Sequence, residues 1–296
     1  MEPITFYNRY TGEMETEQVY GEGFLKWAYG NPLGKLALHG FVKRAFFSKW
    51  YGRRMDNPKT KEKIGPFIDD YDMKVEDFLD DPESYQHFND FFYRKLKPSA
   101  RPVHESDIVF PADGRHLGFE NAEQVDGVFI KGQKWDLKKL INDDALYEKF
   151  KGGSLVLSRL CPVDYHRFHF PAAGKAGECT LINGPLFSVS PIALRQNLSY
   201  MWQNKRTRTL LETPNHGDML IMEIGATCVG SIHQTYESNS TVGKAAEKGY
   251  FAFGGSSTIT IFEPNKVKLA ADLLEHSSQQ NELYALMGDK MGTGVE

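Results

Sequence analysis

The chain has 296 residues, which fits one large domain or two ordinary ones and suffices to bury a sizeable core. Its 41% hydrophobic and 25% charged residues are typical of a folded domain and argue against a disordered, collagen-like or coiled-coil protein. The formal net charge of −4 at pH 7 is too small and too acidic for a general nucleic-acid binder, so no nucleic-acid partner is expected.

The cysteines and the apolar runs bear on compartment and membrane topology. Cys161, Cys179 and Cys228 are odd in number and lack CxxC spacing, which argues against a disulfide framework and a thiolate zinc site and favours a reduced cytosol. The first residues show neither the basic nor the apolar region of a signal peptide. No apolar stretch approaches the roughly 20 residues of a spanning helix, so we expect any membrane contact to be peripheral.

The first distinctive segment, Gly23–Arg54, is both basic and aromatic. It contains seven Lys or Arg residues and no Asp or Glu, interleaved with eight Phe, Trp or Tyr residues. Basic side chains attract anionic headgroups, and aromatic rings favour the headgroup boundary. The apolar residues from Leu33 to Trp50 are not confined to one stripe, however. From the segment alone, a membrane-docking surface and an ordinary helix pair packed on the core both stay open.

Farther along the chain the pattern changes from helical to β. Residues Val75–Lys95 are predicted to form helices, and Pro98 and Pro102 then interrupt the chain, which places a boundary near residue 100. We therefore expect an α+β protein with a helical region at residues 1–100 and a β-rich catalytic domain at residues 101–296. Strands are predicted at Leu155–Leu160, Ala176–Ile182, Leu220–Ile232 and Thr258–Phe262, with a strand and then a helix from Lys266 to Leu274 and beyond.

Four short motifs contain residues suited to catalysis, and each also has a plain structural interpretation. Asp113 follows a proline and precedes a glycine, which is most often a turn. His166 and His169 are three residues apart, but Pro171 argues against the helix that would put both on one metal. The stretch 184–189 is interpreted as a turn leading into a strand. Ser256 follows two glycines, which allow a base to approach it closely.

Asp113, His169 and Ser256 together contain the residue types of a catalytic triad. Their order along the chain is allowed, because triads are defined by geometry and role. Most chains of this length contain such a set, so the residue types alone do not establish one.

The motifs in combination resemble those of the phosphatidylserine decarboxylase family. Each is weak alone, whereas their shared order over nearly the whole chain is specific. The chain departs from the family pattern at Ala245, where the family often has glycine, and at Asn204–Arg206. The motifs are PADG (Pro111–Gly114), YHRFHFP (Tyr165–Pro171), LFSV (Leu186–Val189), VGSI (Val229–Ile232), GGSS (Gly254–Ser257) and ELYALMGDKMG near the C-terminus.

The resemblance implies a zymogen that cuts itself between Gly255 and Ser256. Ser256 Oγ would attack the Gly255 carbonyl to give an ester, with His169 as the base and Asp113 orienting it. Elimination and loss of ammonia would turn Ser256 into a pyruvoyl group, the cofactor of the enzyme. The products would be a large chain of residues 1–255 and a small chain of 41 residues, 256–296.

The resemblance also implies the reaction and its partners. A Schiff base between the pyruvoyl carbonyl and the amine of phosphatidylserine would delocalise the charge left by decarboxylation, and His166 is the candidate donor of the returning proton. Neither a metal nor pyridoxal phosphate is needed. The substrate lies in an anionic membrane, so we expect a peripheral protein on the cytoplasmic face of the cell membrane, and by resemblance alone a homodimer.

Three other functions stay open at this stage. A serine hydrolase could use Asp113, His169 and Ser256 without cutting its own backbone. A lipid-binding module could keep the fold and lack catalysis. A decarboxylase of the same family could act on a different serine phospholipid.

Overall fold

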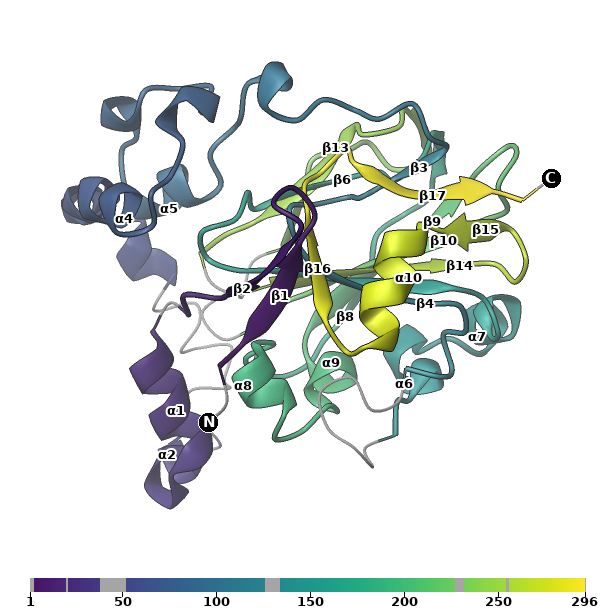
Figure 1. The fold of residues 1–296 in the computed structure, drawn as a ribbon, viewed down its shortest axis with the longest axis horizontal. Helices are drawn as coiled ribbons and strands as arrows, with labels where there is room; N and C mark the ends of the chain where they lie inside the picture. Colours follow the sequence, from purple (N-terminus) through teal and green to yellow (C-terminus); the bar gives the residue numbers. More distant parts are fainter. Residues whose placement is uncertain are drawn as a thin grey trace.

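A large, mainly antiparallel sheet organises the fold (Figure 1). The computed structural model describes residues 3–19, 21–37, 52–125, 134–226, 232–253 and 256–295, and within these ranges the sheet has 11 strands. Their order is β12-β7-β9-β10-β14-β5-β4-β16-β1-β2, and β8 also pairs with β9. The strands are β1 (Thr5–Asn8), β2 (Glu13–Thr16), β4 (Gly114–Phe119), β5 (Leu155–Leu160), β7 (Gly174–Ala176), β8 (Thr180–Ile182), β9 (Arg206–Glu212), β10 (Met219–Ile224), β12 (Ser240–Val242), β14 (Ser256–Phe262) and β16 (Glu282–Ala285).

Two smaller sheets and short helices complete the described part of the chain. One sheet has the order β11-β13-β6, with β6 at Arg167–His169, β11 at Ile232–Gln234 and β13 at Glu247–Phe251; the other has the order β15-β17-β3, with β3 at Ile108–Val109, β15 at Val267–Leu269 and β17 at Lys290–Gly294. The α-helices are α1 (Glu22–Gly30), α2 (Pro32–Ala37), α4 (Ile64–Asp70), α5 (Phe88–Phe92), α6 (Leu137–Ile141), α7 (Asp144–Phe150), α8 (Pro191–Leu194), α9 (Tyr200–Gln203) and α10 (Ala271–Ser278). The short 3-10 helices are η2 (Pro58–Lys63), η3 (Val75–Asp77), η4 (Pro82–Ser84) and η5 (Pro98–Ala100).

Strand β14 lies in the middle of the large sheet and is buried along its whole length. It pairs antiparallel with β10 on one side and with β5 on the other. Ile259 and Ile261 belong to the largest apolar core, whereas Phe262 belongs to the second one. Both faces are therefore covered, which explains why this strand lacks the alternation of a half-exposed strand.

Aromatic side chains hold the helical segment between residues 52 and 100 together. Phe67 packs edge to face on Phe88 and Phe91 at centroid distances of 5.3 and 5.8 Å, and the rings of Phe88 and Phe91 are tilted at 5.6 Å. Phe253, from the loop that precedes β14, completes this cluster and contacts Phe88 at 5.3 Å. The helical segment is thus packed against Phe253, three residues before Ser256.

The predicted α+β class, with a helical N-terminal region and a large sheet, is confirmed. Strand Leu155–Leu160 coincides with β5, β14 begins two residues before its predicted start, and the strand and helix from Lys266 onward are β15 and α10. The division near residue 100 stays a prediction. Strands β1 and β2 nevertheless join the large sheet through the pairing of β1 with β16.

Other predicted elements were wrong in extent. Ala176–Ile182 is two strands, because three residues, 177–179, lie opposite two residues of β9, and this bulge interrupts the pairing. Val75–Lys95 holds only short helical turns and α5. The strand expected from Leu220 ends at Ile224, β11 begins at Ile232, and residues 227–231 lie outside the described residues. Among the described residues, the turn at 184–189 leads into α8 and not into a strand.

Candidate active site

Asp113 and Ser256 lie at the same end of the large sheet, where strands β4 and β14 begin. Strands β4 and β14 both pair antiparallel with β5, so they run parallel to each other and begin at the same end. Ser256 opens β14 opposite Leu160, and Asp113 directly precedes β4. Two strand spacings separate the backbones of β4 and β14, which is about 10 Å.

Gly114 explains the glycine of the PADG motif. Its φ is 158°, and a Cβ atom at this position would lie 2.5 Å from the carbonyl oxygen of Arg159. Only glycine therefore lets the chain turn this closely against β5. This turn places Asp113 at the start of β4, where its side chain is almost fully buried.

His169 lies beside the segment that carries Asp113. Its backbone N–H donates to the carbonyl of Pro111 at 2.7 Å, and the N–H of Val109 donates to the carbonyl of Pro171 at 3.0 Å. The imidazole is buried, and burial lowers the pKa of His169 to about 4, although the charges of Glu247 and Asp113 oppose this effect. His169 is therefore neutral near pH 7, the form that can accept a proton.

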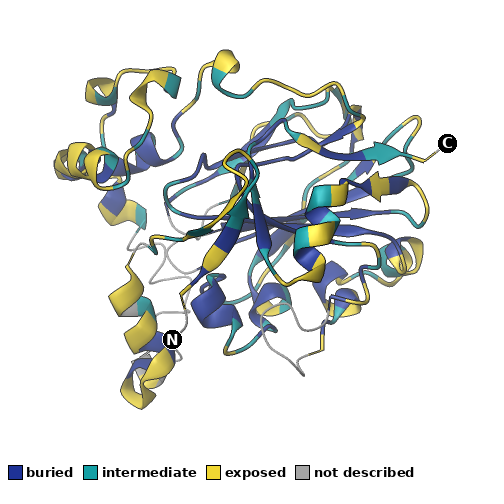
Figure 2. Ribbon diagram, in the orientation of Figure 1, coloured by how far each residue is buried: buried dark blue, intermediate teal, exposed yellow. Residues whose placement is uncertain are grey.

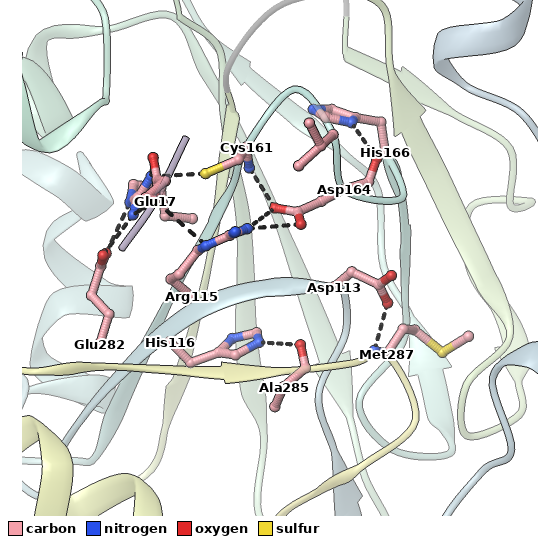
Figure 3. A network of polar contacts seen from close by, with 12 residues as sticks. Glu17, Asp113, Arg115, His116, Cys161, Asp164, His166, Glu282, Ala285 and Met287 are labelled. Atoms are coloured by element: carbon pink, nitrogen blue, oxygen red, sulfur yellow. Dashed lines mark hydrogen bonds and ion pairs between the residues drawn. The ribbon is translucent and has the colours of Figure 1, made fainter. Parts of the chain in front are cut away.

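The hydrogen bonds of Asp113 go elsewhere. Its carboxylate accepts from the guanidinium of Arg101 and from the backbone N–H of Met287, the second of which is drawn in Figure 3. Among the described residues no hydrogen bond joins Asp113 to His169, and the Nδ1 atom of His169 has no partner. The structure thus brings the two side chains into one neighbourhood without the bond expected of a triad.

Ser256 is fully buried, and its hydroxyl has no hydrogen-bond partner within the described part of the chain. The hydroxyls of Ser257 and Thr258 share this property. Unpartnered buried hydroxyls at three consecutive positions are unusual, because such groups normally find a partner, and a catalytic role is one explanation for them. Gly255, the other residue of the predicted cleavage site, lies outside the described residues.

His166 lies on the loop that follows β5 and is also fully buried. Its Nδ1 atom is 3.0 Å from the carbonyl oxygen of Asp164, and its ring packs on Phe92 at a centroid distance of 3.9 Å. Phe92 in turn contacts Phe253 at 4.9 Å. The carbonyl of His166 also accepts from the N–H of Phe251 at 2.9 Å. Both ends of His166 are therefore tied to the segment that leads to Ser256.

A buried ionic network supports the His166 loop, and sequence reasoning missed it (Figure 3). Arg115 donates to both carboxylate oxygens of Asp164, at 2.7 and 2.6 Å, and lies 3.4 Å from Glu17. Arg159 pairs with Glu17 and Glu282, each at 2.6 Å. The one sequence signal was an arginine within the apolar run of β5, since a charge at a buried strand position requires a partner.

A second buried ion pair, also missed, joins the large sheet to the β11-β13-β6 sheet. Lys248 of β13 and Glu223 of β10 are fully buried, with Nζ and Oε1 2.8 Å apart. Gln234 accepts from Lys248 at 2.8 Å, and Thr207 donates to Glu223 at 2.5 Å. Glu223 lies opposite Thr258 in the pairing of β10 with β14, so this pair lies two residues along β14 from Ser256.

The described residues contain no evident metal-binding site. No group of three or more His, Cys, Asp or Glu side chains among them is placed to hold an ion. Cys161 and Cys179 are free thiols, and Cys228 lies outside the described residues.

The profile of the phosphatidylserine decarboxylase family matches residues 88–293. A protein of Fusobacterium nucleatum named phosphatidylserine decarboxylase proenzyme is 47% identical over 293 residues, which is 98% of both chains. Proteins of the same name from Clostridium botulinum and Clostridium perfringens are each 42% identical and cover 98% or more of both chains. The resemblance seen in the motifs is confirmed, and the chain belongs to the phosphatidylserine decarboxylase family.

Proposed function

We propose that this chain is the proenzyme of a pyruvoyl-dependent carboxy-lyase that converts phosphatidylserine to phosphatidylethanolamine and carbon dioxide. The observation that carries the proposal is the state of Ser256, a fully buried residue at the head of the central strand whose hydroxyl has no described partner. It stands in a chain that relatives named as phosphatidylserine decarboxylase proenzymes match end to end.

Self-cleavage begins at the hydroxyl of Ser256. Oγ bonds to the carbonyl carbon of Gly255, the C–N bond between the two residues breaks, and the proton of Oγ passes through His169 to the leaving nitrogen. The low pKa of His169, about 4, leaves its imidazole neutral and able to take that proton. Removal of the Ser256 Cα proton then breaks the bond between Cβ and the ester oxygen and releases the carboxylate of Gly255. Hydrolysis by water then removes the former amino group as ammonia and leaves the pyruvoyl carbonyl.

The surroundings of Ser256 fit a small covalent carbonyl group. The site is enclosed, and the unpartnered hydroxyl of Thr258, on the same face of β14 as Ser256, remains as a polar neighbour. When present, the pyruvoyl group supplies a carbonyl that accepts the electrons released by decarboxylation. His166 holds the proton that returns to the substrate Cα. Asp164 and Phe92 fix the orientation of its ring.

Helices α1 and α2 are proposed to lie on the membrane. Trp27 is 44% exposed, whereas Leu33 and Leu36 are 71% and 72% exposed, and Figure 2 shows the exposed face that these helices present. Exposed large apolar groups beside basic residues are typical of an interfacial surface. Residues 38–51 of the basic, aromatic segment lie outside the described residues. In the part of the chain that the structure describes, no helix is long and apolar enough to cross a bilayer.

The proposal is tested by comparing the wild-type chain with Ser256→Ala. Intact mass should show two chains for the wild type, the smaller of 41 residues and blocked to N-terminal sequencing, and one chain for the variant. Only the processed protein should release carbon dioxide from phosphatidylserine vesicles. A whole wild-type chain that reacts with a fluorophosphonate probe would instead support a serine hydrolase, and a whole, unreactive chain a lipid-binding protein.

His166 is tested after processing. His166→Ala, isolated as two chains, should lose most of its decarboxylase turnover, because general acid catalysis contributes about 10²- to 10⁴-fold. Unchanged turnover of this processed variant would exclude His166 as the proton donor. The dimer and the cytoplasmic face of the membrane remain parts of the proposal that size and fractionation measurements address.

A further inference from the structure

The guanidinium of Arg101 binds the carboxylate of Asp113. Arg101 Nε donates to both oxygens, at 2.9 and 3.0 Å, and Nη2 donates to Oδ2 at 2.5 Å. The N–H of Met287 donates to Oδ1 at 2.8 Å. Each oxygen thus receives two hydrogen bonds, which uses the acceptor capacity of a carboxylate. Asp113 is buried and Arg101 is partly buried, and a bidentate charge-assisted contact of this kind is strong.

This arrangement leaves His169 without the partner that a triad requires. In a triad the carboxylate accepts a hydrogen bond from His Nδ1, fixes the tautomer and stabilises the imidazolium that forms. Here Nδ1 of His169 has no described partner, although the backbone bond to Pro111 holds the residue beside the Asp113 segment. His169 can therefore gain this bond only if Arg101 gives up part of its contact with Asp113.

Arg101 has a second carboxylate within reach. Asp77, at the end of η3, lies 3.7 Å from Nη1 of Arg101 and is partly exposed, whereas Asp113 is buried. Arg101 follows η5, at the junction between the helical segment and the catalytic sheet. A small movement of the side chain would exchange Asp113 for Asp77 without leaving the guanidinium unpaired.

We propose that Arg101 restrains self-cleavage by holding Asp113 away from His169, and that Asp77 is the alternative partner that allows its release. Arg101 is in this sense a positioning residue, since it acts on the reacting groups through Asp113. The inference rests on the proposed cleavage between Gly255 and Ser256. It gives the junction near residue 100 a role in timing the maturation of the enzyme.

The charged groups around His169 predict how release changes its titration. Glu247 of β13 and Asp113 favour the imidazolium, Arg167 on its own strand opposes it, and the Tyr165 ring lies 5.8 Å away. A hydrogen bond from His169 to Asp113 would add a direct contact to the charged form and so raise the pKa of His169. Because cleavage needs the neutral base, a higher pKa moves the acid limb of the cleavage rate to higher pH.

The test follows the appearance of the small chain by pulse-chase in a reconstituted cell-free translation system at a series of pH values. Arg101→Gln keeps side-chain donors and removes the charge. It should release the small chain about tenfold faster, a fraction of the roughly 10²- to 10⁴-fold that general acid-base catalysis contributes, with the acid limb at higher pH. Arg101→Lys, which cannot bind both oxygens as a fork, should be intermediate.

Asp77→Asn should have the opposite effect and slow the cleavage, because Arg101 then loses its alternative partner. Cleavage of Arg101→Gln at or below the wild-type rate would overturn the inference, as would an Asp77→Asn rate equal to wild type. If Arg101→Gln is insoluble, Asp77→Asn decides alone. A wild-type chain that never cuts would overturn the proposed function as well, and this outcome is recognised before any variant is compared.

Discussion

Gly114 is the single residue on which the geometry of the candidate site depends most directly. Its positive φ and the 2.5 Å approach of a Cβ to the Arg159 carbonyl leave no room for a side chain. Gly114→Ala should therefore lower the free energy of unfolding by about 2 to 4 kcal/mol, because strain at a special backbone position is among the largest single-residue effects. Chemical denaturation of the uncut Ser256→Ala background measures this.

The matched control is Gly23→Ala. Gly23 is exposed in α1, and a Cβ atom there has no neighbour within 4 Å. Alanine should keep or raise stability by up to about 1 kcal/mol, since it is the better helix former. Equal effects of the two substitutions would contradict the assignment of a special role to Gly114.

Because of Glu17, the free energy of unfolding should decrease as the pH falls into the acid range. Burial raises its pKa, but the guanidiniums of Arg159 and Arg115 outweigh burial and lower it from 4.5 to about 2. The unfolded chain therefore takes up this proton first, and the stabilisation is present above pH 4.5 and is lost as the pH falls toward 2. A shift of this size corresponds to about 3 kcal/mol.

The measurement is the free energy of unfolding of Ser256→Ala and of Ser256→Ala with Glu17→Gln, between pH 6 and pH 3. The loss on acidification should be smaller in the Gln variant, because one titrating group has been removed. Parallel curves would show that Glu17 titrates alike in the folded and unfolded chains.

How far the sequence could predict the site depends on the kind of contact. Asp113, His166, His169 and Ser256 lie in short motifs, and the resemblance of those motifs in combination to a known family singles these residues out. Their partners could not be inferred in the same way. Glu17 and Arg159 are 142 residues apart, and only the pairing of remote strands and loops brings such charges together. The bond between Asp113 and Arg101 likewise depends on the path of the chain after η5.

At the scale of elements, apolar runs predicted strands better than spacing predicted helices. Strand β5 was found at its true limits because six consecutive buried residues form one uninterrupted strand. The bulge at residues 177–179 leaves no comparable mark in the sequence. The segment after Val75 consists of short turns. Tertiary contacts of aromatic side chains such as Phe78 and Phe91, rather than intrinsic helix propensity, stabilise these turns.

Helix α1 packs against the rest of the protein, whereas α2 exposes apolar side chains to solvent, and this arrangement suits a membrane-docking element. The hydroxyl of Tyr29 accepts from the N–H of Ser188 at 2.7 Å, and the Tyr29 ring packs on Tyr200. On α2, Leu33 and Leu36 point into solvent. Replacing both leucines with glutamate should lower binding to anionic vesicles by about tenfold or more, since inserting one such side chain contributes about 1.5 to 3 kcal/mol. Vesicle co-sedimentation measures the change.

Leu79→Glu combined with Leu181→Glu is the matched control, because both leucines are also about half exposed and lie outside α1 and α2, and the double substitution adds the same two negative charges. It should leave vesicle binding unchanged, and all variants should unfold at the wild-type temperature. Equal loss of binding in the control would show that added negative charge, rather than loss of an apolar contact, explains the effect.

At the scale of the whole molecule, the proposed cut separates two chains that share one sheet. The small chain would contribute β14 between β10 and β5, and β16 between β4 and β1. Six residue pairs join β14 to each of its neighbours. Ile259, Ile261 and Phe262 of β14 are fully buried in the two main cores. Removing a central strand would open both cores to water, which is far costlier than the loss of one peptide bond.

The two chains should therefore remain together until the protein unfolds, and they should unfold as one bimolecular unit. Native mass spectrometry should find the large and small chains in one particle, and denaturing conditions should release both. Because dissociation accompanies unfolding, the midpoint of the processed enzyme should rise with protein concentration, whereas that of uncut Ser256→Ala should not. Release of the 41-residue chain from folded protein would contradict the central place of β14 and β16, since a chain that leaves freely cannot be holding the sheet together.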